Sequence, residues 1–218
     1  MEDASTWTQG KTFQPNGTTA TVQTFSRKIP TGPPWFLRVS THPPEEGTFS
    51  DFWDVLGENH YNNQAEYTPA ITNATLVNAI EPGVMEVWSI HFELSAPFSP
   101  RTFTVLVITH LETVTPRQGW IISVPFDTSG DEAMLAMEER GIRGKYAAIQ
   151  RIKELEDGHV ELRKASTTTM GGLIPDWFIT RSVPANMAQD IGRFITWVKP
   201  QGRNPSQSQP QLGATKSK

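Results

Sequence analysis

The sequence contains no cysteine, and this absence removes a whole set of chemistries. Disulfide bonds, thiol catalysis and thiolate metal sites are excluded, while the redox compartment is only weakly constrained. No apolar run approaches the ~20 residues that a membrane-spanning helix needs. Residues 1–16 also lack the basic flank and apolar stretch of a secretory signal. We therefore expect a cytoplasmic protein without a transmembrane segment.

Several motifs that mark common enzymes are also missing. His-Glu-x-x-His, the Walker phosphate loop, Gly-x-Gly-x-x-Gly and Gly-x-Ser-x-Gly do not occur, and the 5 histidines show no metal-ligand spacing. A formal charge of −4, with acidic and basic residues interspersed, argues against nucleic-acid binding, which needs clustered Lys and Arg. We expect no metal, no cofactor and no nucleic-acid partner, and the sequence leaves the oligomeric state open.

Composition divides the chain into three parts. Residues 1–33 form a polar lead-in rich in Thr, Gln, Gly and Pro, which suits an extended segment lying on the domain. Residues 34–199 carry the apolar patterns of a folded domain, and a length of 218 residues suits one domain better than two. Residues 200–218 are rich in Pro, Gln and Ser and cannot bury a core, so we expect them to be disordered.

Most of the central domain has the pattern of β-strands. Strands are predicted where β-branched and aromatic residues alternate with polar ones, and turn pairs such as Pro82-Gly83 and Asp157-Gly158 separate them. Thr48 or Ser50 is a suitable cap for a short helix, and a second helical turn is predicted over 62–67. The predicted strands are 35–42, 74–81, 84–94, 102–113, 119–126, 146–155 and 160–169.

The end of the domain has the pattern of one long amphipathic helix. Met187, Ile191, Phe194, Ile195 and Val198 recur at spacings that place them on one helix face. Because most of the preceding chain is predicted as strand, this helix must pack on a sheet, and a sheet curved around one helix encloses a cavity. We predict an α+β fold: a curved antiparallel sheet of about seven strands around a long C-terminal helix, with two short helices after the first strand.

Alternation along the strands assigns side chains to the inner face of the predicted sheet. Glu86 and Arg101 are then charges on an apolar face near strand ends, where a rim position or structural ion pair is the alternative to ligand contact. Tyr146 lies inward beside small alanines, which fits a pocket or close helix packing. The predicted ligand-binding residues are Arg38, His42, Trp88, Ile90, Phe103, Val105, Tyr146, Met187, Ile191 and Phe194.

Four motifs occur in an order shared with a known family. They are Trp35-Phe36-Leu37-Arg38-Val39-Ser40-Thr41-His42, Phe49-Ser50-Asp51-Phe52-Trp53, Pro97-Phe98-Ser99-Pro100-Arg101-Thr102-Phe103, and Gly171-Gly172-Leu173-Ile174-Pro175-Asp176-Trp177 with Asp190, Phe194 and Trp197. Over about residues 35–199 the chain resembles the fungal START-like domains of unknown function. These belong to the helix-grip superfamily with START lipid-transfer domains, birch-pollen allergens and aromatic polyketide cyclases. The resemblance implies a hydrophobic ligand in an internal tunnel and assigns no catalytic residues.

Three hypotheses about function follow. The first is a binding protein or carrier for a lipid, sterol or polyketide- or terpenoid-like molecule, held between the sheet and the C-terminal helix and oriented by Arg38, Glu86 and Arg101. The alternative is a cofactor-independent cyclase or isomerase of specialised metabolism, with Glu86, Arg101 and Tyr146 as candidate catalytic residues. The third is a structural interaction module whose tunnel is filled by its own side chains.

Overall fold

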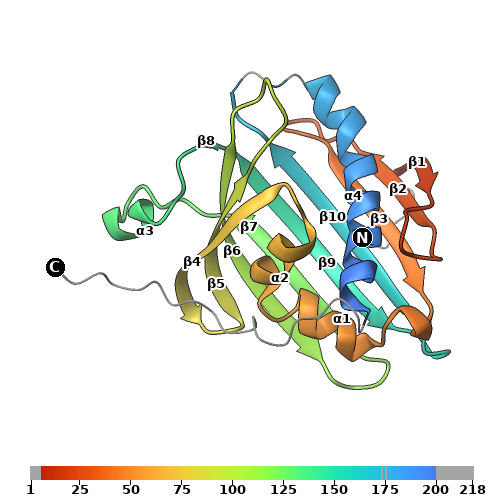
Figure 1. The fold of residues 1–218 in the computed structure, drawn as a ribbon. Helices are drawn as coiled ribbons and strands as arrows, with labels where there is room; N and C mark the ends of the chain where they lie inside the picture. Colours follow the sequence, from red (N-terminus) through yellow and green to blue (C-terminus); the bar gives the residue numbers. More distant parts are fainter. Residues whose placement is uncertain (1–5, 173, 175, 200–218) are drawn as a thin grey trace.

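The computed structural model describes residues 6–172, 174 and 176–199 (Figure 1). The tail predicted over 200–218 lies outside the described residues. The strands are β1 (Thr8–Phe13), β2 (Val22–Arg27), β3 (Trp35–His42), β4 (Ile71–Glu81), β5 (Met85–Phe92), β6 (Arg101–Glu112), β7 (Gln118–Pro125), β8 (Ile142–Arg143), β9 (Lys145–Glu154) and β10 (Val160–Thr169). The helices are α1 (Phe49–Leu56), α2 (His60–Tyr67), α3 (Glu132–Ala136) and α4 (Asp176–Val198), and a 3-10 turn spans Pro44–Glu46.

The strands form one curved sheet, and α4 lies across its concave face (Figure 1). The strand order is β1-β2-β3-β10-β9-β7-β6-β5-β4, with antiparallel neighbours throughout, and the short β8 pairs in parallel with β6. The predicted fold is confirmed, including the two short helices after the strand at residues 35–42. The sheet has 10 strands rather than about seven, because β1, β2 and β8 join those that the alternation predicted.

The N-terminal segment corrects one expectation. Residues 8–13 and 22–27 are not a lead-in lying on the domain but two strands that continue the sheet beyond β3. β1 is almost wholly exposed, so backbone pairing and not burial defines it. In β2 the inward side chains of Val22 and Thr24 are buried, and the Thr24 hydroxyl donates to the Lys11 carbonyl at 2.6 Å. The sheet therefore begins with residues that carry almost no alternating apolar pattern.

The core lies between α4, α1 and the concave face of the sheet. Ile191, Phe194 and Ile195 of α4 are buried against Phe52 of α1, and the Phe52 and Phe194 rings meet edge to face at a centroid distance of 5.1 Å. Burial of each such side chain contributes about 1.5–3 kcal/mol. The helix begins at Asp176, earlier than the periodicity indicated, and contains Pro184. Its C-terminal half is thus the part fixed by the core.

A capping box starts α1 at Thr48, one of the two cap residues that the sequence suggested. The Thr48 side chain accepts a hydrogen bond from the Asp51 backbone N–H, and the Asp51 carboxylate accepts one from the Thr48 backbone N–H. This reciprocal pairing satisfies donors that the first helical turn leaves free. The helix then presents Phe49, Phe52, Trp53 and Leu56 to the core.

Gly119 of β7 lies directly under α1, and a side chain there has no room. A Cβ atom at Gly119 would collide with the indole ring of Trp53. We expect Gly119→Ala to lower the free energy of unfolding by about 1–3 kcal/mol, because overpacking displaces α1 from the sheet. Urea denaturation measures this change. Gly130→Ala is the matched control, since a Cβ there meets nothing within 4 Å; equal losses in the two variants would contradict the packing explanation.

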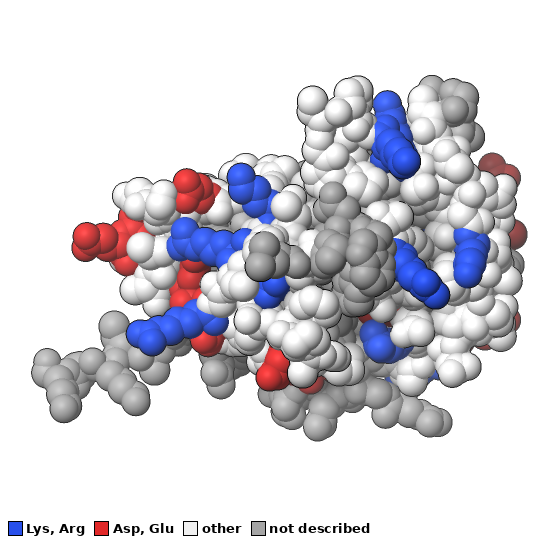
Figure 2. Space-filling model, turned by 90° about the horizontal axis from the view of Figure 1, so that it is seen from above, with Lys and Arg blue, Asp and Glu red and all other residues white. Residues whose placement is uncertain are grey.

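The charges on the surface are more ordinary than those in the interior. On the face drawn in Figure 2, Lys and Arg side chains are spread among uncharged residues. Across the described ranges, no helix combines the length and the apolar character needed to cross a membrane. The unusual charges of this chain lie in its interior instead.

Candidate ligand-binding cavity

A cavity of ≈ 170 Å³ lies between the sheet and helices α2 and α4. Its sheet side comes from β5, β6, β9 and β10, and its opposite side from α2 and the N-terminal half of α4. Aromatic and aliphatic side chains form most of the wall, and a few polar groups converge on it. The lining residues are Tyr61, Gln64, Thr68, Ile90, Phe92, Leu94, Phe103, Tyr146, Lys164, Ser166, Thr168, Met170, Val183, Asn186, Met187 and Asp190.

Lys164 of β10 brings a positive charge to the cavity wall. It lies on the inner face of the sheet between Leu162 and Ser166, which are both buried. Lys164 itself is only half-buried, because it lines the cavity. Its ammonium lies over the Tyr146 ring, with Nζ 5.8 Å from the ring centroid. Burial, together with the nearby Arg38 charge, lowers the pKa of Lys164 to about 8, although Asp190 opposes this shift. The amine is therefore mainly charged at pH 7, but its pKa lies closer to pH 7 than that of an exposed lysine.

Arg38 of β3 is the cross-strand neighbour of Lys164 and is buried. Its pKa is lowered by burial, an effect that Asp190 opposes. Asp190 comes from α4 and forms an ion pair with Arg193 at 3.0 Å. Arg38 Nη1 has no hydrogen-bond partner among the residues that the structure describes. Two cations thus face one carboxylate, and that carboxylate is already paired with Arg193.

Phenol groups supply neutral hydrogen-bonding atoms around the cavity. Burial raises the pKa values of Tyr61, Tyr67 and Tyr146 above their ordinary range, so all three are neutral at pH 7. The Tyr61 hydroxyl is 3.0 Å from Ser123 Oγ, whereas Thr68 Oγ1 is buried without a partner in the described part of the chain. The site can therefore donate several hydrogen bonds to a bound molecule.

The structure brings four of the predicted ligand-binding residues to the cavity: Ile90, Phe103, Tyr146 and Met187. Phe103 and Tyr146 meet edge to face, with centroids 6.5 Å apart. Four other predicted residues face inward but belong to the packed core or its edge, and are not in the cavity wall: Trp88, Val105, Ile191 and Phe194. Arg38 lies next to the wall through its pairing with Lys164.

Glu86 and Arg101 are not brought together with Tyr146. Glu86 accepts hydrogen bonds from the Trp88 indole N–H and the Gly83 backbone N–H, both at 2.8 Å, at the far end of β5. Arg101 is buried and donates to backbone carbonyls, including that of Met170 at 2.8 Å and that of Ser99. Arg101 thus ties the start of β6 to the chain that follows β10. Both side chains are thus held by hydrogen bonds within the protein, away from the cavity wall.

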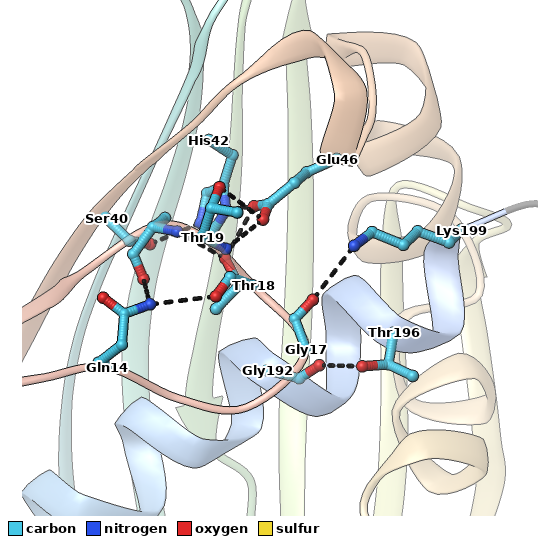
Figure 3. Close-up of polar contacts among 11 residues, drawn as sticks. Gln14, Gly17, Thr18, Thr19, Ser40, His42, Glu46, Gly192, Thr196 and Lys199 are labelled. Atoms are coloured by element: carbon cyan, nitrogen blue, oxygen red, sulfur yellow. Dashed lines mark hydrogen bonds and ion pairs between the residues drawn. The ribbon is translucent and has the colours of Figure 1, made fainter.

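His42 lies at the other end of β3, in a polar network shown in Figure 3. Its Nε2 is 2.8 Å from Ser40 Oγ and its Nδ1 is 2.7 Å from Glu46 Oε2. The Glu46 carboxylate also accepts hydrogen bonds from Thr18 Oγ1 at 2.7 Å and from the Thr19 backbone N–H at 2.5 Å. Glu46 therefore fastens the β1–β2 connection to the end of the sheet.

The connectivity Ser40–His42–Glu46 is that of a hydrolytic triad, but its surroundings are not those of an active site. All three side chains are at most 3% exposed. None of the main hollows formed by the described residues is lined by any of them. Burial lowers the pKa of His42, although its hydrogen bond to Glu46 opposes that effect. The network therefore acts as a structural tie.

A larger hollow of ≈ 790 Å³ lies outside the domain interior, between residues 13–17 and the outer side of α4. It is an open groove, and beside it Gly17 and Gly192 allow residues 13–17 to approach α4 closely. Figure 3 shows these two glycines on the two segments. Lys199 Nζ donates to the Gly17 carbonyl at 3.3 Å at one end. We take the smaller internal cavity as the candidate site because it combines apolar enclosure with buried charge.

Sequence reasoning missed Lys164 and Asp190, although one signal was present. In 160–169 the even positions are Val160, Leu162, Lys164, Ser166 and Thr168, and the Asp157-Gly158 turn fixes this strand's register with β9. The alternation places Lys164 on the inner face. Asp190 had no comparable signal, since it stands at the edge of an amphipathic helix.

Comparisons with known proteins agree with this architecture. Human StAR-related lipid transfer protein 5 has a TM-score of 0.71 at 15% identity, over 92% of this chain and 89% of that one. The lipid transfer and protein localization domain of human StarD13 gives 0.66 at 14% identity, over 88% of both chains. A STAR-related lipid transfer protein from Xanthomonas axonopodis gives 0.64 at 14% identity, over 91% of this chain and 99% of that one.

Sequence comparison gives the family. No protein with a curated function matches the sequence significantly. The model of a family described as "Protein of unknown function (DUF3074)" matches residues 35–198, which is most of the chain. The chain therefore belongs to this family of unknown function, and it has the helix-grip fold of START lipid-transfer domains.

Proposed function

We propose that this protein binds a small hydrophobic molecule in the cavity between the sheet and α4. The observation that carries the proposal is an enclosed, mainly apolar wall into which a few polar groups project, the usual form of a small-molecule site. The names of the structurally similar proteins, which are lipid transfer domains, support the same class of ligand. Apolar burial supplies the affinity, and the polar groups fix the orientation.

The cavity volume sets the size of molecule that fits without rearrangement. An engineered cavity of about 150 Å³ in another protein binds benzene, and typical ligand pockets measure about 300–1,000 Å³. A cavity of ≈ 170 Å³ therefore accepts one ring or a short branched chain. A lipid, a sterol or a polyketide is larger, and its binding requires the N-terminal half of α4 to move away from the sheet. This half carries Val183, Asn186 and Met187 and lies beyond the core that fixes Ile191 and Phe194.

Filling the cavity tests the proposal. Thr168 lines the cavity, and its neighbour Thr169 is exposed on the opposite face of the same strand. We expect Thr168→Phe to weaken binding of the neutral probe 2-phenylethanol at least about tenfold, because the ring occupies the space of the ligand. Thr169→Phe should leave the affinity within about twofold, since it adds the same ring outside the cavity. Isothermal titration calorimetry measures both. Equal affinities in the two variants would place the probe elsewhere.

A cyclase or isomerase is the second proposal, and Lys164 is the observation that favours it. An amine whose pKa is lowered to about 8, beside the neutral phenol of Tyr146, is suited to acid–base assistance. Of the three predicted catalytic residues, Tyr146 alone lines the cavity. Native mass spectrometry followed by organic extraction separates the two proposals. An apolar molecule recovered unchanged in stoichiometric amount supports binding, and a cyclised product supports catalysis.

A further inference from the structure

We infer that the ligand of this cavity carries an anionic group, in the simplest case a carboxylate, which binds Lys164 with its cross-strand neighbours Arg38 and Gln150. The inference rests on the proposed function and adds to it the chemical class of the ligand. It comes from three features of the inner sheet surface: a row of polar side chains, their unpartnered donors, and the balance of charge around them.

The polar row crosses three adjacent strands. Lys164 of β10 is in register with Arg38 of β3 on one side and with Gln150 of β9 on the other. All three side chains project to the concave face, where the alternating residues of each strand are buried. Residues directly opposite each other on one sheet face have Cβ atoms about 4.5–5.5 Å apart. Lys164 and Arg38 are therefore like charges held side by side, an unfavourable arrangement unless an anion lies between them.

The flanking residues present donors that the protein does not use. Arg38 is 6% exposed and Gln150 is 3% exposed. Within the described ranges, neither Arg38 Nη1 nor Gln150 Nε2 has a hydrogen-bond acceptor. A buried donor without an acceptor is unfavourable, and a carboxylate offers two oxygens that each accept several hydrogen bonds. The row is thus deficient in acceptors of the kind that an anionic group supplies.

The charges that face Lys164 leave a positive balance. Asp190 of α4 is the only carboxylate among the described residues that line the cavity, and it forms an ion pair with Arg193. Tyr61 and Tyr67 of α2 and Tyr146 of β9 are neutral, because burial raises their pKa values. Arg38 and Lys164 therefore outnumber the facing negative charge, and one anionic ligand group balances them.

The rest of the cavity fixes the other end of the ligand. Phe92 and Phe103 meet edge to face with centroids 5.4 Å apart, and Ile90 completes an apolar wall on the β5–β6 side. A molecule with its anionic group at Lys164 would place its apolar part against this wall. The available volume suits one aromatic ring on a short acidic side chain.

Two probes of nearly the same shape test the inference in the intact protein. Phenylacetate is anionic at pH 7, and 2-phenylethanol is neutral. We expect wild-type protein to bind phenylacetate at least about tenfold more tightly, since burial strengthens a charge-assisted hydrogen bond. Lys164→Met should bring the affinity ratio close to one while 2-phenylethanol still binds. Lys153→Met is the matched control, because Lys153 projects from the outer face of β9, and it should keep the wild-type ratio.

A pH series gives a second readout that needs no variant. Because Lys164 loses its proton near pH 8, the preference for phenylacetate should fall between pH 7 and pH 9, whereas 2-phenylethanol affinity should stay constant. Equal affinities for the two probes at pH 7 would overturn the inference and leave the proposed function standing. Failure of both probes to bind would overturn both. A preference for phenylacetate that persists in Lys164→Met would assign the anion to another site and also overturn the inference.

Discussion

Replacing Glu46 with alanine is expected to lower the free energy of unfolding by about 3–5 kcal/mol, because three hydrogen bonds to one charged group are lost and each contributes about 1.5–3 kcal/mol where water is excluded. One carboxylate accepts hydrogen bonds from Thr18, Thr19 and His42. Burial raises its pKa, but the hydrogen bonds from His42, Thr19 and Thr18 together outweigh burial and lower it. Without the carboxylate the buried His42 N–H has no acceptor and carries its full desolvation penalty, and the part-buried hydrogen bonds from Thr18 and Thr19 lose a charged acceptor.

The neighbouring residue supplies a control for this variant. Glu45 lies in the same 3-10 turn and is exposed, so Glu45→Ala changes the same charge without touching the network. We expect chemical denaturation to show a change within about 0.5 kcal/mol for Glu45→Ala. Hydrogen exchange should also show faster exchange at residues 18–20 in Glu46→Ala, because the tie between the β1–β2 connection and the sheet is lost. Similar free energies of unfolding in the two variants would show that the hydrogen bonds of Glu46 do not stabilise the fold.

The central strands were predictable because large apolar side chains alternate along one face of each. Trp88 and Ile90 lie on the inner face of β5 and are buried, and Val87 and Ser89 on the opposite face are buried as well. In β6, Phe103 and Val105 follow the same rule, which burial of alternate side chains enforces. The apolar face of α4, with Ile191, Phe194 and Ile195, was equally predictable, because one face of the helix packs against the core. Wherever burial fixed the pattern, sequence reasoning recovered the fold.

The N-terminal strands were not predictable for the complementary reason. β1 is exposed along almost its whole length, so no apolar alternation marks it. Its place depends on backbone pairing with β2, on the hydrogen bond from Thr24 to Lys11, and on the distant tie at Glu46. Such long-range contacts leave no local periodicity in the sequence.

The candidate site was only partly predictable because its chemistry departs from the usual rules of burial. The apolar members of the wall, such as Phe103 and Met187, follow from strand and helix periodicity. The same alternation places Lys164 on the inner face, but it was not chosen as a site residue because a lysine is almost never expected on a buried face. Glu86 and Arg101 satisfied the alternation equally well, yet each finds protein partners near a strand end. The alternation along a strand determines on which face of the sheet a residue lies. Its position along the strand then decides whether it lines the cavity.

Acid should destabilise this protein from about pH 6.5 downward, through His60 at the start of α2. His60 is 8% exposed, and its Nδ1–H donates to the Leu56 carbonyl at 2.7 Å. Burial, together with the charge of Lys164, lowers its pKa to about 3. The unfolded chain takes up a proton near pH 6.5, whereas the folded protein does so only near pH 3. Stability is therefore complete above pH 6.5 and falls as the pH drops toward 3.

The size of the effect follows from proton linkage. One proton bound by the unfolded state alone costs about 1.4 kcal/mol per pH unit, so His60 accounts for about 2 kcal/mol between pH 6.5 and 5. His42 adds to the same slope, because burial lowers its pKa too. Most carboxylates of the unfolded chain titrate below this window, at about pH 4. The interval from pH 6.5 to 5 thus isolates the buried histidines.

His60→Phe provides the decisive comparison, since phenylalanine keeps a ring against Tyr61 and removes the titrating group. Urea denaturation at several pH values should give a slope between pH 6.5 and 5 that is smaller by about 1.4 kcal/mol per pH unit than in wild-type protein. The slope is informative even if the lost hydrogen bond to Leu56 lowers stability at every pH. His110→Phe, at an exposed position of β6, controls for replacing a histidine by an aromatic ring. A wild-type slope in His60→Phe would show that this imidazole is not held neutral by the fold.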